Sequence, residues 1–219
     1  MDFLLQIVAI IVSVMIILAL EGMRKPRLKF VRGESGVLFP NDPHGRQPAK
    51  WTHVYVYNEP MPKWLSWAFD RNPAIGCHGW ITFHALDGRD LFDKRMPIRW
   101  ADNLEPVIQD PKTGKAMGID WDKMRTGGTW DIPPGDLTDG EYGNLDVVFR
   151  AKSDSECYGW NNDSYLFNWR YPEWNLDKGR YLAKIVIRTG GQSFTEIFEI
   201  MNQGRYEDFR LVESDNKLL

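Results

Sequence analysis

Hydrophobic and polar residues alternate with a period of two in five segments of this chain between residues 52 and 200. The alternating segments are residues 52–58, 77–85, 145–150, 181–188 and 194–200. Successive side chains of a β-strand point to opposite faces, so this alternation predicts strands that are buried on one side. Gly190-Gly191, between the last two segments, predicts a tight β-hairpin turn.

The connections between these segments predict the fold class. Glycine- and proline-rich turn signals occur at Asp87-Gly88, Asp110–Gly114, Gly127-Gly128 and Pro133–Asp136. No long segment of helical period separates the strands, which disfavours a parallel sheet with crossover helices. We therefore expect a mainly β protein with an antiparallel β-sandwich. The expected inward-facing residues are Val54, Val56, Cys77, Ile81, Phe83, Leu145, Val147, Phe149, Tyr181, Ala183, Ile185, Ile187, Phe198 and Ile200.

The first segment has a different pattern. The eighteen residues from Phe3 to Leu20 carry no charge, and Gln6 and Ser13 are their only polar side chains. As a helix they would extend roughly 27 Å, close to the roughly 30 Å of a bilayer's hydrocarbon core. A cleaved signal peptide is the alternative, but it calls for a basic start and small residues before the cut, where this chain has Asp2 and Glu21. We expect a retained transmembrane anchor.

Basic residues follow this helix and none precedes it. They are Arg24, Lys25, Arg27, Lys29 and Arg32. Lys and Arg near a span favour the cytoplasmic side, so we expect a single-pass protein of the cell membrane whose soluble domain is cytoplasmic. The expected organisation is an anchor over 1–22, a basic juxtamembrane segment with a linker or first strand over 23–50, the β-sandwich over 51–212 and a flexible tail over 213–219.

Several short motifs carry a family resemblance. They are the strand ending at Asn58, Ala74 and Cys77 at the start of the next strand, Ile98-Arg99-Trp100, Ile132–Gly135, Leu145–Phe149, Phe198–Ile200 and Phe209–Leu211. Between Trp51 and Leu211 the chain resembles uncharacterised prokaryotic membrane-anchored proteins with an immunoglobulin-like β-sandwich. The resemblance implies that fold and carries over no catalytic residue. Two segments fit it poorly and are expected to be insertions, Pro60–Asn72 and Glu105–Arg125.

Tryptophan is abundant, with ten residues among 219, and the formal net charge is −3. This charge gives no reason to expect a nucleic-acid partner. If the first two alternating strands lie side by side, their outward side chains form one aromatic and histidine-rich face. Its members are Trp51, His53, Tyr55, Tyr57, His78, Trp80 and His84, with Thr82 among them. Such a face is typical of an interaction surface.

Four readings of this face remain open. It could bind a protein partner, or, if the domain faced outward, it could bind a carbohydrate or another small ligand. The tryptophan-bearing loop from Gly159 to Trp174 could instead fold over it and form a second small core. His53, His78 and His84 could also share a metal in a metal-dependent enzyme, although no acidic or thiolate ligand accompanies them at a helpful spacing. No catalytic or cofactor motif is recognised, so neither enzymatic activity nor a bound cofactor is expected.

A second aromatic segment follows the first alternating strand. Residues 61–71 combine Trp64, Trp67 and Phe69 with Lys63 and Arg71, a composition typical of a membrane-interface segment. The alternative is a loop whose tryptophans cap the sandwich core. The two cysteines, Cys77 and Cys157, could form one disulfide in an exported domain, and we expect reduced thiols in a cytoplasmic one. The leading hypothesis is a membrane-anchored module that binds another protein or has a structural role at the membrane.

Overall fold

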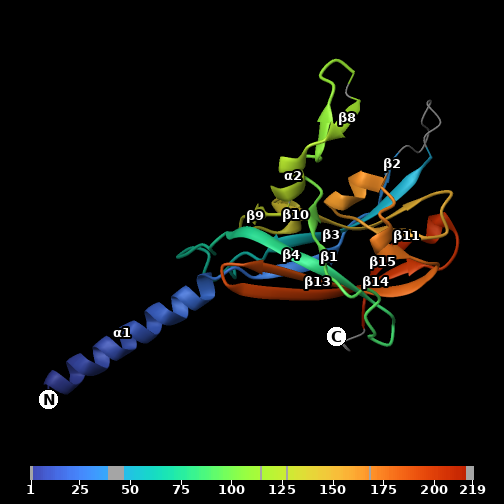
Figure 1. Ribbon diagram of the computed structural model, residues 1–219. Coiled ribbons are helices and arrows are strands. Elements are labelled where there is room, and N and C mark those ends of the chain that lie inside the picture. Colours follow the sequence, from blue (N-terminus) through green and yellow to red (C-terminus); the bar gives the residue numbers. More distant parts are fainter. Residues whose placement is uncertain (1, 39–46, 114, 127, 168, 216–219) are drawn as a thin grey trace.

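The fold is a β-sandwich joined to one long N-terminal helix (Figure 1). The computed structural model describes residues 2–38, 47–113, 115–126, 128–167 and 169–215. Helix α1 (Asp2–Arg24) projects away from two packed antiparallel sheets. The expected mainly β class, with a sandwich preceded by an apolar helix, is confirmed.

Helix α1 is long and apolar enough to cross a membrane. Within its span from Phe3 to Arg24, an 18-residue window has a mean hydropathy of 3.0, and no residue of that window is buried against the rest of the protein. Exposing so much apolar surface to water is unfavourable, and a helix of this kind near the N-terminus is found both in membrane spans and in signal sequences.

The first sheet has seven strands within the described residues, in the order β1-β3-β10-β11-β12, with β2 paired to β3 and β6 paired to β10. These strands are β1 (Leu28–Arg32), β2 (Gly36–Leu38), β3 (Ala49–Asn58), β6 (Arg99–Trp100), β10 (Tyr142–Ala151), β11 (Cys157–Gly159) and β12 (Asn175–Leu176). The segment expected as a juxtamembrane linker or first strand thus contains β1 and β2, and both belong to the sandwich.

The second sheet has six strands among the described residues, in the order β15-β14-β13-β4-β5, with β9 paired to β4. Its strands are β4 (Ala74–His84), β5 (Met96–Pro97), β9 (Trp130–Ile132), β13 (Gly179–Thr189), β14 (Gln192–Asn202) and β15 (Arg210–Glu213). The hairpin between β13 and β14 turns at Gly190 and Gly191, whose φ angles are +53° and +76°. Glycine adopts these left-handed angles without steric cost, so the predicted glycine turn is confirmed.

The remaining elements decorate the sandwich. They are the hairpin of β7 (Val107–Gln109) and β8 (Ala116–Ile119), helix α2 (Trp121–Thr126), and the 3-10 turns η1 (Leu137–Asp139), η2 (Asn162–Phe167), η3 (Pro172–Trp174) and η4 (Tyr206–Asp208). The segment Glu105–Arg125, expected as an insertion, contains the hairpin and most of α2. The hairpin extends away from the sheets (Figure 1).

Side chains from both sheets meet in the main core. Thirteen of the fourteen residues expected to face inward are buried, and Tyr181 is half-buried. Phe149 is buried in a separate cluster on the outer side of its sheet, so its predicted direction is wrong. Both cysteines are buried free thiols in the main core. Burial raises the pKa of the Cys77 thiol to about 11 and raises that of Cys157 further, so both react slowly at neutral pH. The end of the predicted tail, residues 216–219, lies outside the described residues.

Candidate functional site

A bulge in β10 brings a carboxylate to the outer face of the first sheet. Asp146 lies opposite His53 of β3, but Val148 lies opposite Thr52, so Val147 is an extra residue in the ladder. From Val148 onward, each side chain points to the face opposite to the one that strict alternation from Leu145 predicts. Phe149 therefore lies opposite Trp51. Asp146 and Phe149 therefore share the outer face with His53 and Trp51.

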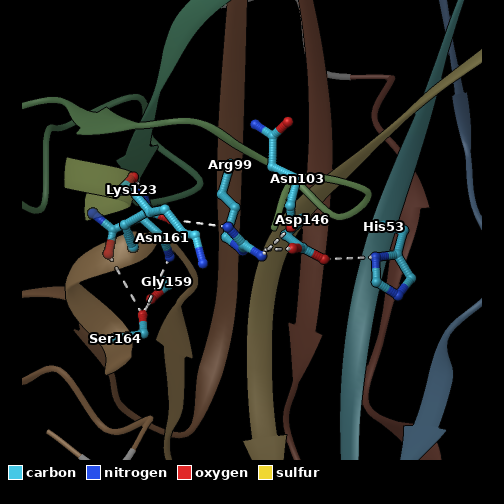
Figure 2. A network of polar contacts seen from close by, with 9 residues as sticks. His53, Arg99, Asn103, Lys123, Asp146, Gly159, Asn161 and Ser164 are labelled. Carbon is cyan, nitrogen blue, oxygen red and sulfur yellow. Dashed lines mark hydrogen bonds and ion pairs between the residues drawn. The ribbon is translucent and has the colours of Figure 1, made fainter. Parts of the chain in front are cut away.

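Asp146 contacts two basic side chains. Its Oδ1 lies 2.9 Å from His53 Nδ1, and its Oδ2 lies 3.7 Å from Arg99 Nε. Figure 2 shows the three side chains pointing toward one another from β3, β6 and β10. The side chains of Asp146 and Arg99 are only 6% and 3% exposed. Charges removed from water to this degree need each other, because an unpaired buried charge is costly.

The Arg99 guanidinium is held from several sides. Nη1 donates to Asn162 Oδ1 at 2.9 Å, and Nη2 donates to the Asn103 carbonyl, also at 2.9 Å. The ring of Tyr165 lies 5.3 Å from the guanidinium carbon, which adds a cation–π contact. Two hydrogen bonds, the ion pair with Asp146 and the Tyr165 ring together fix the direction of the Arg99 guanidinium.

Aromatic side chains form the wall next to this network. The Trp51 ring centroid lies 4.6 Å from Phe149, 5.3 Å from Trp160 and 5.4 Å from Trp169. Trp160 and Trp169 come from the loop after β11, which folds over the outer face of β3 and β10 and forms a second small core there. The structure thus shows the reading in which the Gly159–Trp174 loop covers part of the aromatic face.

A pocket of about 250 Å³ opens between the charged network and the aromatic wall. Its polar lining comes from His53, Arg99, Glu105 and Asp146, and its aromatic lining comes from Trp51, Trp160, Tyr165 and Trp169. The second ring nitrogen of His53 lies on the Gly36 side, where an added Cβ would be 3.3 Å from it. Gly36 and His53 both line the pocket.

Two features prepare the pocket for binding. Burial raises the pKa of Tyr165 far above its usual value, and the nearby Glu105 carboxylate acts in the same direction. A phenol is protonated at neutral pH with or without this shift, so the Tyr165 hydroxyl is a hydrogen-bond donor there. Trp169 has φ +71°, a left-handed angle that costs a residue with a bulky side chain of order 1–3 kcal/mol. Such strain persists where surrounding contacts impose it, and it is concentrated at ligand sites.

Comparison with known proteins gives no relative for this site. No protein-family model, curated protein or solved structure matches the chain.

The single aromatic face expected from the sequence does not exist. Strands β3 and β4 belong to different sheets, so their outward side chains lie on opposite sides of the sandwich. Trp51 and His53 lie at the pocket, and Tyr55 and Tyr57 lie further along β3. The Tyr55 ring packs at a tilt against Tyr142, with 4.7 Å between the ring centroids. His78, Trp80 and His84 belong to the other sheet.

On that second sheet, Trp80 and His84 are engaged locally. The guanidinium carbons of Arg95 and Arg188 each lie 4.8 Å from the Trp80 ring. His84 uses both ring nitrogens, Nδ1 at 2.7 Å from Asp90 and Nε2 at 2.8 Å from the Thr82 hydroxyl. The predicted metal site shared by His53, His78 and His84 is wrong, because His53 lies in the first sheet and the other two lie in the second. Among the described residues, no group of three or more His, Cys, Asp or Glu side chains is placed to hold a metal ion.

The predicted membrane-interface segment lies elsewhere, beside the end of α1. Trp64 and Trp67 are 71% and 84% exposed, whereas Phe69 is half-buried. The alternative in which these tryptophans cap the sandwich core is therefore wrong. Among the basic residues of the flank, Arg24 lies in the last turn of α1, and Lys29 and Arg32 lie in β1.

Proposed function

We propose that this protein is a single-pass, membrane-anchored recognition module and that the His53–Asp146–Arg99 pocket is its binding site. The observation that carries the proposal is the pocket itself, where a rigid buried charge network faces an aromatic wall. Binding sites combine apolar walls with a few fixed polar groups in this way. We assign the pocket a binding role and no chemical step.

The size and lining of the pocket favour a side chain of a partner protein as the occupant. At about 250 Å³ it is smaller than the ~300–1,000 Å³ typical of sites for drug-sized ligands. Tryptophan, tyrosine and arginine are the residues that dominate binding energy at protein interfaces, and they do so around small, well-packed pockets. A single sugar ring is the second candidate, since the indoles offer stacking surfaces and His53, Glu105 and Asp146 offer polar partners.

We also propose that the sandwich is immunoglobulin-like. Strands β1-β3-β10 and β14-β13-β4-β5 have the neighbour order of A-B-E and G-F-C-C′ in that fold. The fold differs outside these strands. Strand β11, which lies beside β10 where strand D would lie, follows β10 in the chain, β15 adds a strand beside β14, and the short strands β6 and β9 pair with β10 and β4. The central strands support the assignment more strongly than these additions weaken it, since the central pairings organise the core.

Removing the Trp169 ring is expected to weaken partner binding by at least about 30-fold, corresponding to a hot-spot loss of about 2 kcal/mol. The substitution is Trp169→Gly, because glycine accepts the left-handed backbone angle and keeps the loop unstrained. The measurement is the yield of covalent adduct in native membranes, formed by a photo-crosslinking amino acid in place of the exposed Glu105. Trp121→Ala, at an exposed tryptophan of α2, is the matched control and should leave the yield unchanged.

Equal adduct yields from the Trp169→Gly chain and the unchanged chain would contradict the proposed protein partner. For the sugar candidate, the solubilised chain is titrated with mono- and oligosaccharides while tryptophan emission is followed. A saturable change that disappears in Trp169→Gly, without any crosslinked protein, would make the sugar the ligand.

The proposed topology places the sandwich in the cytoplasm, supported by the basic residues after α1. Lys112→Cys introduces a thiol at the exposed turn of the β7–β8 hairpin, while Cys77 and Cys157 remain buried and slow to react. A membrane-impermeant maleimide should label the thiol introduced by Lys112→Cys only after the cells are lysed. Labelling on intact cells would place the domain outside and would favour the sugar candidate.

A further inference from the structure

The end of α1 is fastened to the sandwich by a buried arginine. Arg71 is 3% exposed, and its Nη1 donates to the carbonyls of Met23 and Lys25 at 2.9 and 2.8 Å. Its Nη2 makes a longer bond of 3.4 Å to the Pro60 carbonyl. Carbonyls in the last turn of a helix have no partner within the helix, so Arg71 supplies one for Met23 and ties the helix end to the loop between β3 and β4.

A second group of hydrogen bonds reinforces this junction. Asn58 accepts from the Arg27 amide and donates to the Asn72 carbonyl, both at 2.9 Å. The Asn72 amide donates to the Arg24 carbonyl at 2.7 Å, and the Glu59 amide donates to the Arg27 carbonyl at 2.9 Å. The helix therefore continues into the sandwich through a hydrogen-bonded junction, and the chain between them is not a loose tether.

The same loop presents two tryptophans to the outside. The amides of Leu65 and Ser66 donate to the Pro62 carbonyl, which closes a turn over 62–66. A second turn follows, in which the amides of Ala68 and Phe69 donate to the Leu65 carbonyl. Trp64 and Trp67, on these two turns, are among the most exposed large apolar side chains of the described residues. Trp67 Nε1 donates to the Trp64 carbonyl at 2.9 Å, so its polar N–H is satisfied within the loop. The ring can therefore enter an apolar layer without leaving a donor unpaired.

We propose that the turn carrying Trp64 and Trp67 is a second membrane contact, inserted into the interfacial layer of the leaflet from which α1 emerges. The inference rests on the proposed membrane anchoring by α1. Trp67 is four residues from Arg71, which limits its Cα to about 14 Å from that of Arg71 at the helix end. Tryptophan concentrates at this depth of a bilayer, and the exposed Lys25, Arg27 and Lys63 beside it attract anionic headgroups.

The bilayer, and not a protein, is the occupant that the geometry favours. The loop is bonded to the first residues after the span, so the membrane surface is necessarily its neighbour. Two contacts, the span and the turn, also fix the tilt and rotation of the sandwich over the membrane. The recognition pocket on the outer face of the first sheet would then have one set height and direction.

The test uses the full chain in vesicles of mixed zwitterionic and anionic phospholipid. Ser66→Cys carries an environment-sensitive fluorophore between the two tryptophans, and Lys112→Cys carries the same dye on the β7–β8 hairpin as the matched control. At position 66 we expect emission at shorter wavelength and strong quenching by lipids labelled near the headgroup. At position 112 we expect a water-like spectrum without lipid quenching. Adding Trp64→Ser and Trp67→Ser should return position 66 to a water-like spectrum.

Alkaline carbonate extraction of the same vesicles separates the two proposals. A chain that stays in the membrane with a water-like dye at position 66 would overturn the membrane contact and leave the anchor in place. A chain that is extracted would overturn the anchor and the contact together. A dye that is water-like in lipid vesicles but shielded in native membranes would show that a protein covers the turn, which also overturns the lipid contact.

Discussion

Replacing Asp146 with alanine is expected to lower the free energy of unfolding by about 3–5 kcal/mol, the usual cost of removing one partner from a buried ion pair. The substitution leaves the Arg99 guanidinium, whose side chain is 3% exposed, without a counter-charge. It also removes the contact at 2.9 Å that orients His53. The measurement is denaturant unfolding of the full chain in detergent micelles, followed by the emission of the pocket tryptophans.

Two variants separate the charge effect from other causes. Asp146→Asn keeps an acceptor of the same shape and should lose less stability than alanine, because one polar contact survives. Asp102→Ala removes an exposed carboxylate near the same strand and should change the stability by less than about 0.5 kcal/mol. If Asp146→Ala unfolded at the same denaturant concentration as Asp102→Ala, the network would have no role in stability and its rigidity could not be invoked for binding.

Much of the sandwich could be predicted because apolar residues recur at every second position over long parts of its main strands. The alternating apolar residues of β3 from Thr52, of β4 from Cys77, of β13 and of β14 are the ones that pack in the main core. The assumption that side chains alternate between the two faces of a strand gave the wrong direction for Phe149. The extra residue at Val147 reverses the direction of the side chains beyond it, and a strand of mostly apolar residues gives no sign of where such a bulge lies.

The prediction of a single aromatic face was wrong for a different reason. Consecutive strands are neighbours in about two-thirds of cases, and β3 and β4 are an exception because their connection passes from one sheet to the other. Strand alternation fixes which side chains share a face of one strand, but it does not say which sheet a strand joins. Trp51 and His53 were therefore correctly grouped with each other and wrongly grouped with Trp80 and His84.

The partners of the pocket could be found from sequence only in part. Asp146 is a charge within an apolar strand, and a buried charge implies a basic partner somewhere. That partner, Arg99, lies in the two-residue strand β6, and the aromatic wall comes from a loop with no periodic pattern. These residues meet through contacts between distant parts of the chain, for which local patterns carry no signal.

Gly79→Ala is expected to destabilise the sandwich by about 3 kcal/mol or more, at the upper end of overpacking effects. A Cβ at this position would lie 1.8 Å from the Val186 carbonyl oxygen and 2.9 Å from its carbon. Both are backbone atoms of the paired strand β13, so no side-chain rotation can relieve the clash. The two central strands of the second sheet would have to separate locally, which would be measured as a lower midpoint of thermal unfolding.

Gly118→Ala is the matched control, because a Cβ at this glycine of β8 meets nothing within 4 Å. It should leave stability unchanged or raise it by up to about 1 kcal/mol, through the smaller conformational freedom of the unfolded chain. A glycine inside an alternating strand is the sequence signal for close backbone approach, and Gly79 stands in the middle of one. If both alanine variants unfolded at the same temperature, β4 and β13 would not approach each other as closely as this register requires, and the order of the second sheet would need to be redrawn.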